Sequence, residues 1–415
     1  MTRWIMTMTI LLTMPLYAQS GFVVGFNNTS IEKDRIDVYW NNLYRSLEVK
    51  AEGAIQLSDD DRDIVGIERG AYLVISERTL FKVRELRVNA GIDGAPVKVF
   101  TIGNHTAPFD DYAKNWLADI LPDVVRYTGL GATYRIQSIV NQRGIEAAIR
   151  EISYVETNGA KVVYYSLLLD RPEMTSDLLQ KVVRKLGEEI SSSTRLKEVL
   201  ASTAKKFPED SILTVALLRA ASEISSSSNH KEALIEIARQ RKLTAEAAVA
   251  MAESIEDISS SSGQADALEV LAELSPASDD AFKAYLKAVK DISSSSAQQN
   301  ALMALLKRTD LSGGTYIALF KTVEYISSSS AQGDVLVKAA AKCPSDDVVL
   351  EAYLQAVVSI SSSSAQGHAL MAMLEKPGLS KTILTRTMDV AKSEVSSRSV
   401  EEQVKDRVYE LMTKN

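Results

Sequence analysis

Apolar positions along this chain follow two periods, one near the N-terminus and another over the rest. Between about Tyr39 and Ile102 apolar and polar residues alternate, which is typical of half-buried strands. The expected strands lie at 47–50, 54–57, 64–65, 72–75, 83–88 and 97–100. From about residue 151 onward, apolar residues recur at helical spacing. The pattern predicts an α+β chain that is mostly α: an antiparallel β-meander domain at 46–107, then a long helical part.

The helical part repeats the phrase Ile-Ser-Ser-Ser every 34 residues. Its isoleucine, which we number position 0 of each repeat, falls at Ile190, Ile224, Ile258, Ile292, Ile326 and Ile360. A fixed period of this size is typical of a solenoid, in which each repeat buries its apolar face against its neighbours. The repeat therefore predicts an extended array.

Two helices are expected in each repeat. Residues able to cap a helix stand at position +20, and apolar residues follow at helical spacing up to the next position 0. These caps are Asp210, Thr244, Ser278, Ser312, Asp346 and Ser380. The other helix is expected to open at the serine of position +3, paired with the glutamine of position +6 in a capping box. Among the aromatic residues of the array, Tyr285, Tyr316, Phe320 and Tyr353 are spaced as core, and Tyr325 is placed to point outward.

The flanks of the array set the domain boundaries. Asp110 can cap a helix reaching about Tyr127, with Pro122 bending or splitting it, and connecting helices occupy 108–150. The solenoid spans 151–415 with degenerate terminal repeats, giving about eight helix hairpins. We interpret it as a right-handed HEAT-like array. A tetratricopeptide array has the same 34-residue period and is the alternative, but its small and aromatic signature is not matched.

Several motifs resemble a bacterial envelope family that pairs a small β region with Ile-Ser-rich HEAT-like helical repeats. The motifs begin at Leu47 (Leu-Glu-Val-Lys-Ala-Glu-Gly), Leu57 (Leu-Ser-Asp-Asp-Asp-Arg-Asp-Ile), Gly70 (Gly-Ala-Tyr-Leu-Val-Ile) and Trp116 (Trp-Leu-Ala-Asp-Ile-Leu-Pro). Some relatives carry this region as the extracytoplasmic tail of membrane metallopeptidases of the β-lactam-sensor type. The resemblance implies a sensing or interaction role, and a membrane-bound peptidase or signalling protein as partner.

The N-terminus predicts export. Residues 1–18 carry one basic residue, Arg3, before an apolar run, and read as a signal peptide cleaved after Ala18. An N-terminal extended segment is expected at 19–45. No later segment is apolar enough to insert in a membrane, so we expect a periplasmic or secreted protein. The net charge of −7 and mixed signs disfavour nucleic acid and anionic membrane surfaces as partners.

The residue types that carry chemistry are sparse, and we predict no enzyme, cofactor or metal site. His105, His230 and His368 lie far apart without a His-Glu-x-x-His pair, and we expect the last two to be solvent-facing or packed. Asp59, Asp61 and Asp63 alternate as in calcium loops, but Ile64 and Gly70 stand where such loops need glycine and glutamate. We interpret this segment as a solvated turn. Cys343 is the single cysteine, without a disulfide partner in the chain.

Two functions remain open from the sequence. The first is a non-catalytic protein-binding scaffold or sensor of the bacterial cell envelope. The alternative is a cell-wall or glycan-binding protein that uses serines at +4 and glutamines at +6 as a binding edge. The residues of this candidate edge are Ser262, Gln264, Ser296, Gln298, Ser330, Gln332, Ser364 and Gln366. A simpler interpretation is that the serine run forms a tight turn between helices.

Overall fold

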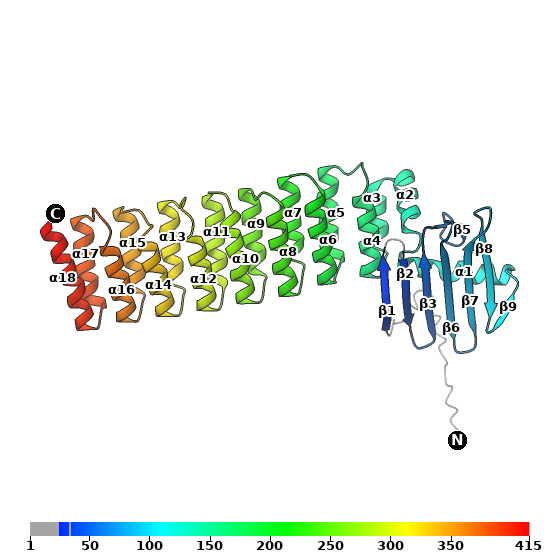
Figure 1. Ribbon diagram of the computed structural model, residues 1–415, viewed down its shortest axis with the longest axis horizontal. Coiled ribbons are helices and arrows are strands. Elements are labelled where there is room, and N and C mark those ends of the chain that lie inside the picture. Colours follow the sequence, from blue (N-terminus) through cyan, green and yellow to red (C-terminus); the bar gives the residue numbers. More distant parts are fainter. Residues whose placement is uncertain (1–24, 33–34, 415) are drawn as a thin grey trace, which may run out of the picture. The chain divides into compact units, whose positions relative to one another are not determined.

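The computed structural model describes residues 25–32 and 35–414 (Figure 1). The expected signal peptide, residues 1–18, lies outside the described residues. The chain divides into two compact units, one ending at Tyr164 and one beginning at Tyr165. In the described residues an antiparallel β region precedes eighteen helices, which confirms the predicted fold class.

The main sheet is antiparallel and has the strand order β1-β2-β3-β6-β7-β8-β9. Its strands are β1 (Gly25–Glu32), β2 (Arg35–Asn41), β3 (Arg45–Glu52), β6 (Tyr72–Thr79), β7 (Val83–Ala90), β8 (Pro96–Ile102) and β9 (His105–Ala107). The short strands β4 (Ile55–Leu57) and β5 (Ile64–Ile67) pair only with each other. The sheet therefore starts earlier than residue 46, and the meander is interrupted by a separate hairpin.

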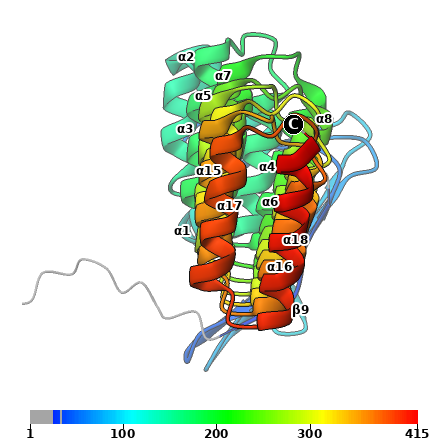
Figure 2. The same ribbon diagram turned by 90° about the vertical axis from the view of Figure 1, so that its left-hand side faces the viewer.

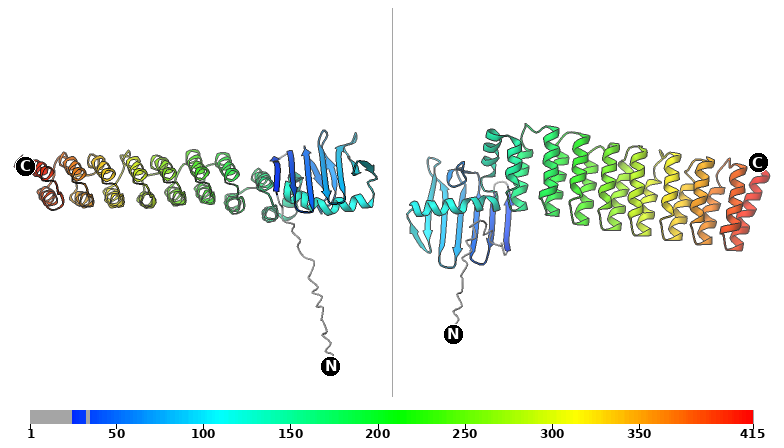
Figure 3. Two further views of the ribbon diagram at one scale, coloured as in Figure 1. Left: turned by 90° about the horizontal axis from the view of Figure 1, so that it is seen from below. Right: turned by 180° about the vertical axis from the view of Figure 1, so that it is seen from behind.

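One face of the sheet is covered by helix α1 (Asp111–Thr128), which crosses the strands (Figure 3). The side chain of Asp110 caps α1 by accepting from the N–H groups of Tyr112 and Ala113, as predicted. On its buried face Trp116 packs 5.1 Å from Phe100 of β8, measured between ring centroids. The helix is continuous through Pro122, so it is not split there.

A buried carboxylate lies between α1 and the sheet. Glu77 of β6 is 4% exposed, and its oxygens lie 2.6 Å from Arg45 Nε and 2.7 Å from Arg84 Nη2. The indole N–H of Trp116 donates to the same carboxylate over 2.8 Å. Two cations and one donor thus compensate the desolvation of Glu77.

Three further helices follow α1: α2 (Ala132–Arg143), α3 (Ile145–Ile152) and α4 (Asn158–Leu169). Gly129 and Gly131 separate α1 from α2 with φ of 71° and 73°, a left-handed conformation that favours glycine. Helix α1 thus ends within one residue of the predicted Tyr127. The segment expected as the first, degenerate repeat, from residue 152 to residue 189, is occupied by α4 and by α5 (Ser176–Glu189).

The second unit contains fourteen complete helices, which form two layers (Figure 2). One layer consists of α5 (Ser176–Glu189), α7 (Ser211–Ala221), α9 (Ala245–Glu256), α11 (Asp279–Asp291), α13 (Gly313–Val323), α15 (Asp347–Val358) and α17 (Lys381–Glu394). The other consists of α6 (Ser193–Lys206), α8 (Ser227–Gln240), α10 (Ser261–Leu274), α12 (Ser295–Leu305), α14 (Ser329–Ala340), α16 (Ser363–Leu374) and α18 (Arg398–Lys414). Each helix packs on the next helix of its own layer, and most also contact their sequence neighbours in the other layer.

The caps of the odd-numbered helices are as predicted. All six residues at position +20 cap their helix through a side-chain oxygen, for example Ser312, which accepts from Thr315 N–H over 3.1 Å. The predicted cap of the even-numbered helices at +3 is wrong by one residue. In α8, α10, α12, α14 and α16 the capping serine is that of position +2, and it accepts from the N–H of position +5, as Ser260 does from Gly263.

The core of the second unit follows the 34-residue period. The six isoleucines at position 0 are all buried, with at most 3% exposure. The expected core aromatic residues Tyr285, Tyr316, Phe320 and Tyr353 are buried as well. Tyr325 is 59% exposed, which confirms that it points outward.

Candidate functional site

The serine run forms the turn that joins each odd-numbered helix to the even-numbered helix after it. We call the residues at positions +1 to +4 of this run the serine edge. Its capping serine is also held by the exposed serine two residues later: the Oγ atoms of Ser260 and Ser262 lie 3.1 Å apart. The equivalent pairs, Ser294 with Ser296 and Ser328 with Ser330, are each 3.0 Å apart. In these three repeats the serine at +4 is thus exposed but retains one intramolecular partner.

The remaining two serines connect one repeat to the next. The Oγ atom of Ser261, at position +3, lies 2.9 Å from the Oγ atom of Ser293, at position +1 of the following repeat. The same bond joins Ser193 to Ser225, Ser227 to Ser259, Ser329 to Ser361 and Ser363 to Ser396. All four positions of the serine run therefore make structural bonds in several repeats, which supports the interpretation as a tight turn.

The glutamines of the candidate edge do not lie on the surface. Gln264, Gln298, Gln332 and Gln366 are between 3% and 5% exposed. The side-chain amide of Gln264 donates to the carbonyl of Ile255 over 3.4 Å, and Gln298 and Gln332 make the equivalent bond. These amide groups satisfy carbonyl groups at the end of the preceding helix. The prediction that the glutamines form an exposed edge with Ser262, Ser296, Ser330 and Ser364 was therefore wrong.

His230 occupies the glutamine position of its own repeat. It is 1% exposed, and its Nε2 atom lies 2.8 Å from the Oγ atom of Ser254. Burial lowers the pKa of His230 to about 4, although the carboxylate of Asp257 acts in the opposite direction. His230 is therefore a packed, neutral side chain, whereas His368 is exposed.

The opposite edge of the array carries a second set of contacts between repeats. Basic side chains near position +16 donate to the last carbonyls of the even-numbered helix of the preceding repeat. Arg241, only 4% exposed, donates to the carbonyls of Ala204 and Pro208. Lys206, Arg308, Lys342 and Lys376 make comparable bonds. Sequence reasoning missed this set, although a basic residue at +16 recurs in four of the six repeats.

A recess opens between α5 and α7 on the layer of odd-numbered helices. Its volume is about 390 Å³. Its residues are Gln180, Arg184, Glu188, Val215, Ala216, Arg219, Ala220 and Glu223. At Gly187 an added Cβ would lie 3.2 Å from Ala220, so the two helices are in close contact there. The recess combines small apolar side chains with two arginines and two glutamates.

The acidic turn of the first unit is held by cations. Arg135 of α2 donates two hydrogen bonds to the carboxylate of Asp61, of 2.8 Å from Nε and 2.6 Å from Nη2. Its guanidinium also donates to Glu151 and Tyr164. Lys98 lies 2.5 Å from the carboxylate of Asp63. Two of the three carboxylates considered for calcium are thus paired with basic side chains, so the turn is an anchored loop and not the freely solvated turn that we expected.

A polar cavity of about 500 Å³ lies between this acidic turn and α2. It is lined by residues 56–61 of the turn, by 134, 135, 137–139 and 141–143 of α2, and by Glu151. Every guanidinium nitrogen of Arg135 already has a partner in the first unit. The cavity therefore offers no buried cation to an incoming anion.

Cys343 lies three residues after the end of α14, and the residue is 4% exposed. Burial raises the pKa of the Cys343 thiol, which opposes formation of the reactive thiolate, with a smaller opposing effect of Lys376. The side chain of Cys343 is therefore buried and packed.

No protein-family model matches the chain, and no curated protein matches it. The resemblance to the envelope family described above remains a prediction. None of the helices in the described ranges has both the length and the apolar character that a bilayer crossing requires.

Proposed function

We propose that this chain is a non-catalytic protein-binding scaffold or sensor module of the bacterial cell envelope, with the array of the second unit as its binding part. The observation that carries the proposal is the recess of about 390 Å³ between α5 and α7. Protein interfaces combine an apolar centre with a polar rim. The recess has this composition, with Val215 and Ala216 beside Arg184, Arg219 and Glu223.

Rigidity of the array supports the same function. Serine hydroxyls join consecutive repeats on one edge, and basic side chains join them on the other. A surface fixed at both edges loses little conformational entropy when an elongated partner binds. Stacked repeats characteristically present extended binding surfaces of this kind.

The setting of this interaction follows from the N-terminal sequence. A signal peptide at residues 1–18 would deliver the mature chain to the periplasm or the exterior. The resembling family adds a membrane-bound peptidase or signalling protein as the proposed partner.

The test is crosslinking in the native envelope, followed by affinity purification of the mature chain and mass spectrometry. The double variant Arg184→Glu with Arg219→Glu reverses both cations of the recess. Lys283→Glu with Lys321→Glu is the matched control, because it reverses two exposed cations elsewhere in the same layer. We expect one dominant membrane protein with the wild type and the control, and its loss with the recess variant. Equal recovery from all three chains would contradict the proposed site.

Glycan binding is the second proposed function, because the serines at position +4 are exposed and recur every 34 residues. Ser262, Ser296, Ser330 and Ser364 would offer hydroxyl groups to a glycan strand running along the serine edge. Retention of the mature chain on purified peptidoglycan, lost when these four serines become alanine, would support glycan binding. Retention that the four substitutions leave unchanged would remove the serine edge as its site.

A further inference from the structure

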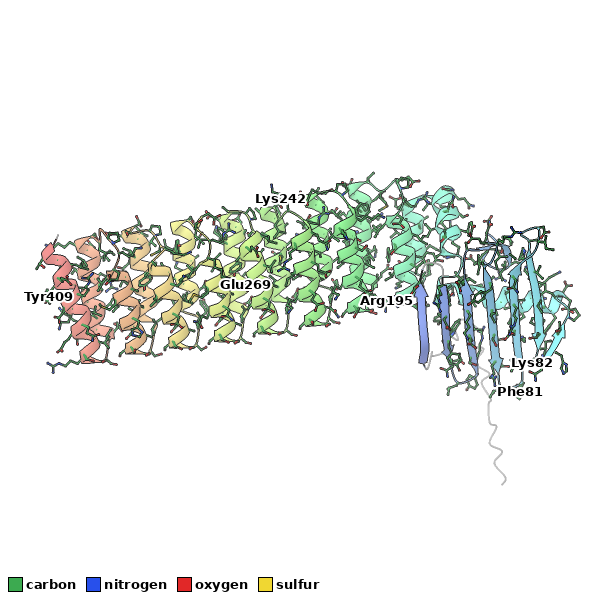
Figure 4. All side chains as sticks on the ribbon, in the orientation of Figure 1. Phe81, Lys82, Arg195, Lys242, Glu269 and Tyr409 are labelled. Atoms are coloured by element: carbon green, nitrogen blue, oxygen red, sulfur yellow. The ribbon has the colours of Figure 1, made fainter. Side chains whose placement is uncertain are left out.

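Two neighbouring hairpins of the main sheet end in large apolar side chains that face solvent. The β2–β3 hairpin carries Leu43 and Tyr44, which are 77% and 70% exposed. The β6–β7 hairpin carries Leu80 and Phe81, which are 69% and 91% exposed. We call these four residues the hairpin tips; Figure 4 labels Phe81 and its neighbour Lys82 at the end of the strands.

Strand register places the two hairpins side by side. Arg45, the first residue of β3, pairs directly with Thr79, the last residue of β6. Strands in a sheet lie about 4.8 Å apart, so the middles of the two hairpins are separated by about 10 Å. Four apolar side chains distant in sequence are thereby gathered at one end of the sheet.

The residues at the hairpin tips are not the types that turns between strands usually contain. Tight turns between strands favour Gly, Asn and Asp, because these residues tolerate the backbone conformation and leave only polar groups in water. Leu80-Phe81 and Leu43-Tyr44 instead expose apolar surface at some cost in solubility. A local choice that does not serve the fold points to a binding role.

Two exposed cations, Arg78 and Lys82, flank the tip of the β6–β7 hairpin. Lys82 follows Phe81 directly, and Arg78 is exposed one residue before the end of β6. Neither turn, 42–44 or 80–82, contains an acidic residue. At the opposite end of the sheet, by contrast, the fully exposed Ile92 is followed by Asp93.

We infer that the hairpin tips dock the first unit onto the surface of a membrane that contains anionic phospholipid. Leu43, Leu80 and Phe81 would enter the boundary between headgroups and acyl chains, with the hydroxyl of Tyr44 at headgroup level. Arg78 and Lys82 would meet the lipid phosphates. The overall acidity of the chain does not reveal this feature, since strand pairing assembles it locally.

A lipid surface fits the tips better than a protein partner does. A stable protein interface buries about 800 Å² on each partner over about 20–30 residues with matching shape. The hairpin tips are two narrow projections of two residues each. Insertion into a fluid lipid surface requires no such complementarity.

The experiment is flotation of the mature chain with two kinds of vesicle, phosphatidylcholine alone and phosphatidylcholine mixed with phosphatidylglycerol. Leu43→Ser with Phe81→Ser removes apolar contacts from both hairpins, and Arg78→Gln with Lys82→Gln removes the cations. Ile92→Ser is the matched control, an exposed apolar side chain at the other end of the sheet. Thermal melting of each variant verifies that the fold is retained.

We expect wild type and Ile92→Ser to float with the anionic vesicles. The apolar double variant should lose roughly tenfold or more in partitioning, and the charge variant should fall to the level measured with neutral vesicles. Wild type remaining in solution with both vesicles, or unchanged partitioning of the apolar double variant, would overturn the inference. So would a photoreactive group at position 81 that captures a protein in the envelope in place of lipid.

Discussion

Removal of the capping serines in the four central repeats should destabilise the array measurably. Ser260, Ser294, Ser328 and Ser362 each accept from a helix N–H over 3.3 to 3.5 Å. These are long bonds, so we assign each substitution to alanine a cost near the lower part of the range for N-caps, about 0.5–1 kcal/mol. The caps belong to different repeats and should act independently, giving about 2–4 kcal/mol for the quadruple variant.

The assay is urea unfolding followed by circular dichroism, with a matched quadruple variant two residues further along. Ser262, Ser296, Ser330 and Ser364 are exposed and contact only the capping hydroxyl where a bond is observed. Their replacement by alanine leaves the cap in place, so the unfolding midpoint should scarcely move. A larger loss of stability in the second set than in the first would refute the assignment of the cap to position +2.

Three further predictions concern single buried groups. Because burial lowers the pKa of His230 to about 4 from 6.5, protonation favours the unfolded chain: the stability contribution is intact above pH 6.5 and declines as the pH falls toward 4. The decline approaches about 3 kcal/mol, and His230→Gln should reduce it in urea titrations at several pH values; identical pH dependence in both chains would contradict this. Glu77→Gln should lower the stability of the first unit by about 3–5 kcal/mol, since it leaves Arg45 and Arg84 without their carboxylate, while the control Glu85→Gln should change the melting temperature little. Cys343 should react slowly with a disulfide reagent in the native chain and rapidly in urea, because its thiol is buried with a raised pKa; a rapid native reaction would show that the turn opens readily.

The sequence was most informative where a residue's neighbours along the chain decide its role. Position +20 is such a case, because Asp, Ser or Thr just before a helical run has a single evident partner, the helix's own N–H groups. Position +3 was misassigned because successive serines offer the same hydroxyl at several registers. Only the helix geometry selects the serine at +2 as the cap.

The remaining differences come from contacts between distant residues. A glutamine three residues after serine resembles a capping box, yet Gln264 reaches back to Ile255 of the preceding helix. The pairing of Arg241 with the carbonyl of Ala204 joins different repeats, as does the close approach of Gly187 and Ala220. The first strand could not be predicted because residues 27–30, Asn-Asn-Thr-Ser, do not alternate between apolar and polar types.

Site-specific photocrosslinking in the native envelope tests whether the array binds a partner protein through the recess between α5 and α7. A photoreactive residue would replace Arg219 in the recess and, in a second chain, Asp266 on the exposed side of α10 in the other layer. We expect one dominant protein adduct from position 219 and none of that mass from position 266. Absence of a protein adduct at 219, or the same adducts at both positions, would contradict binding through the recess.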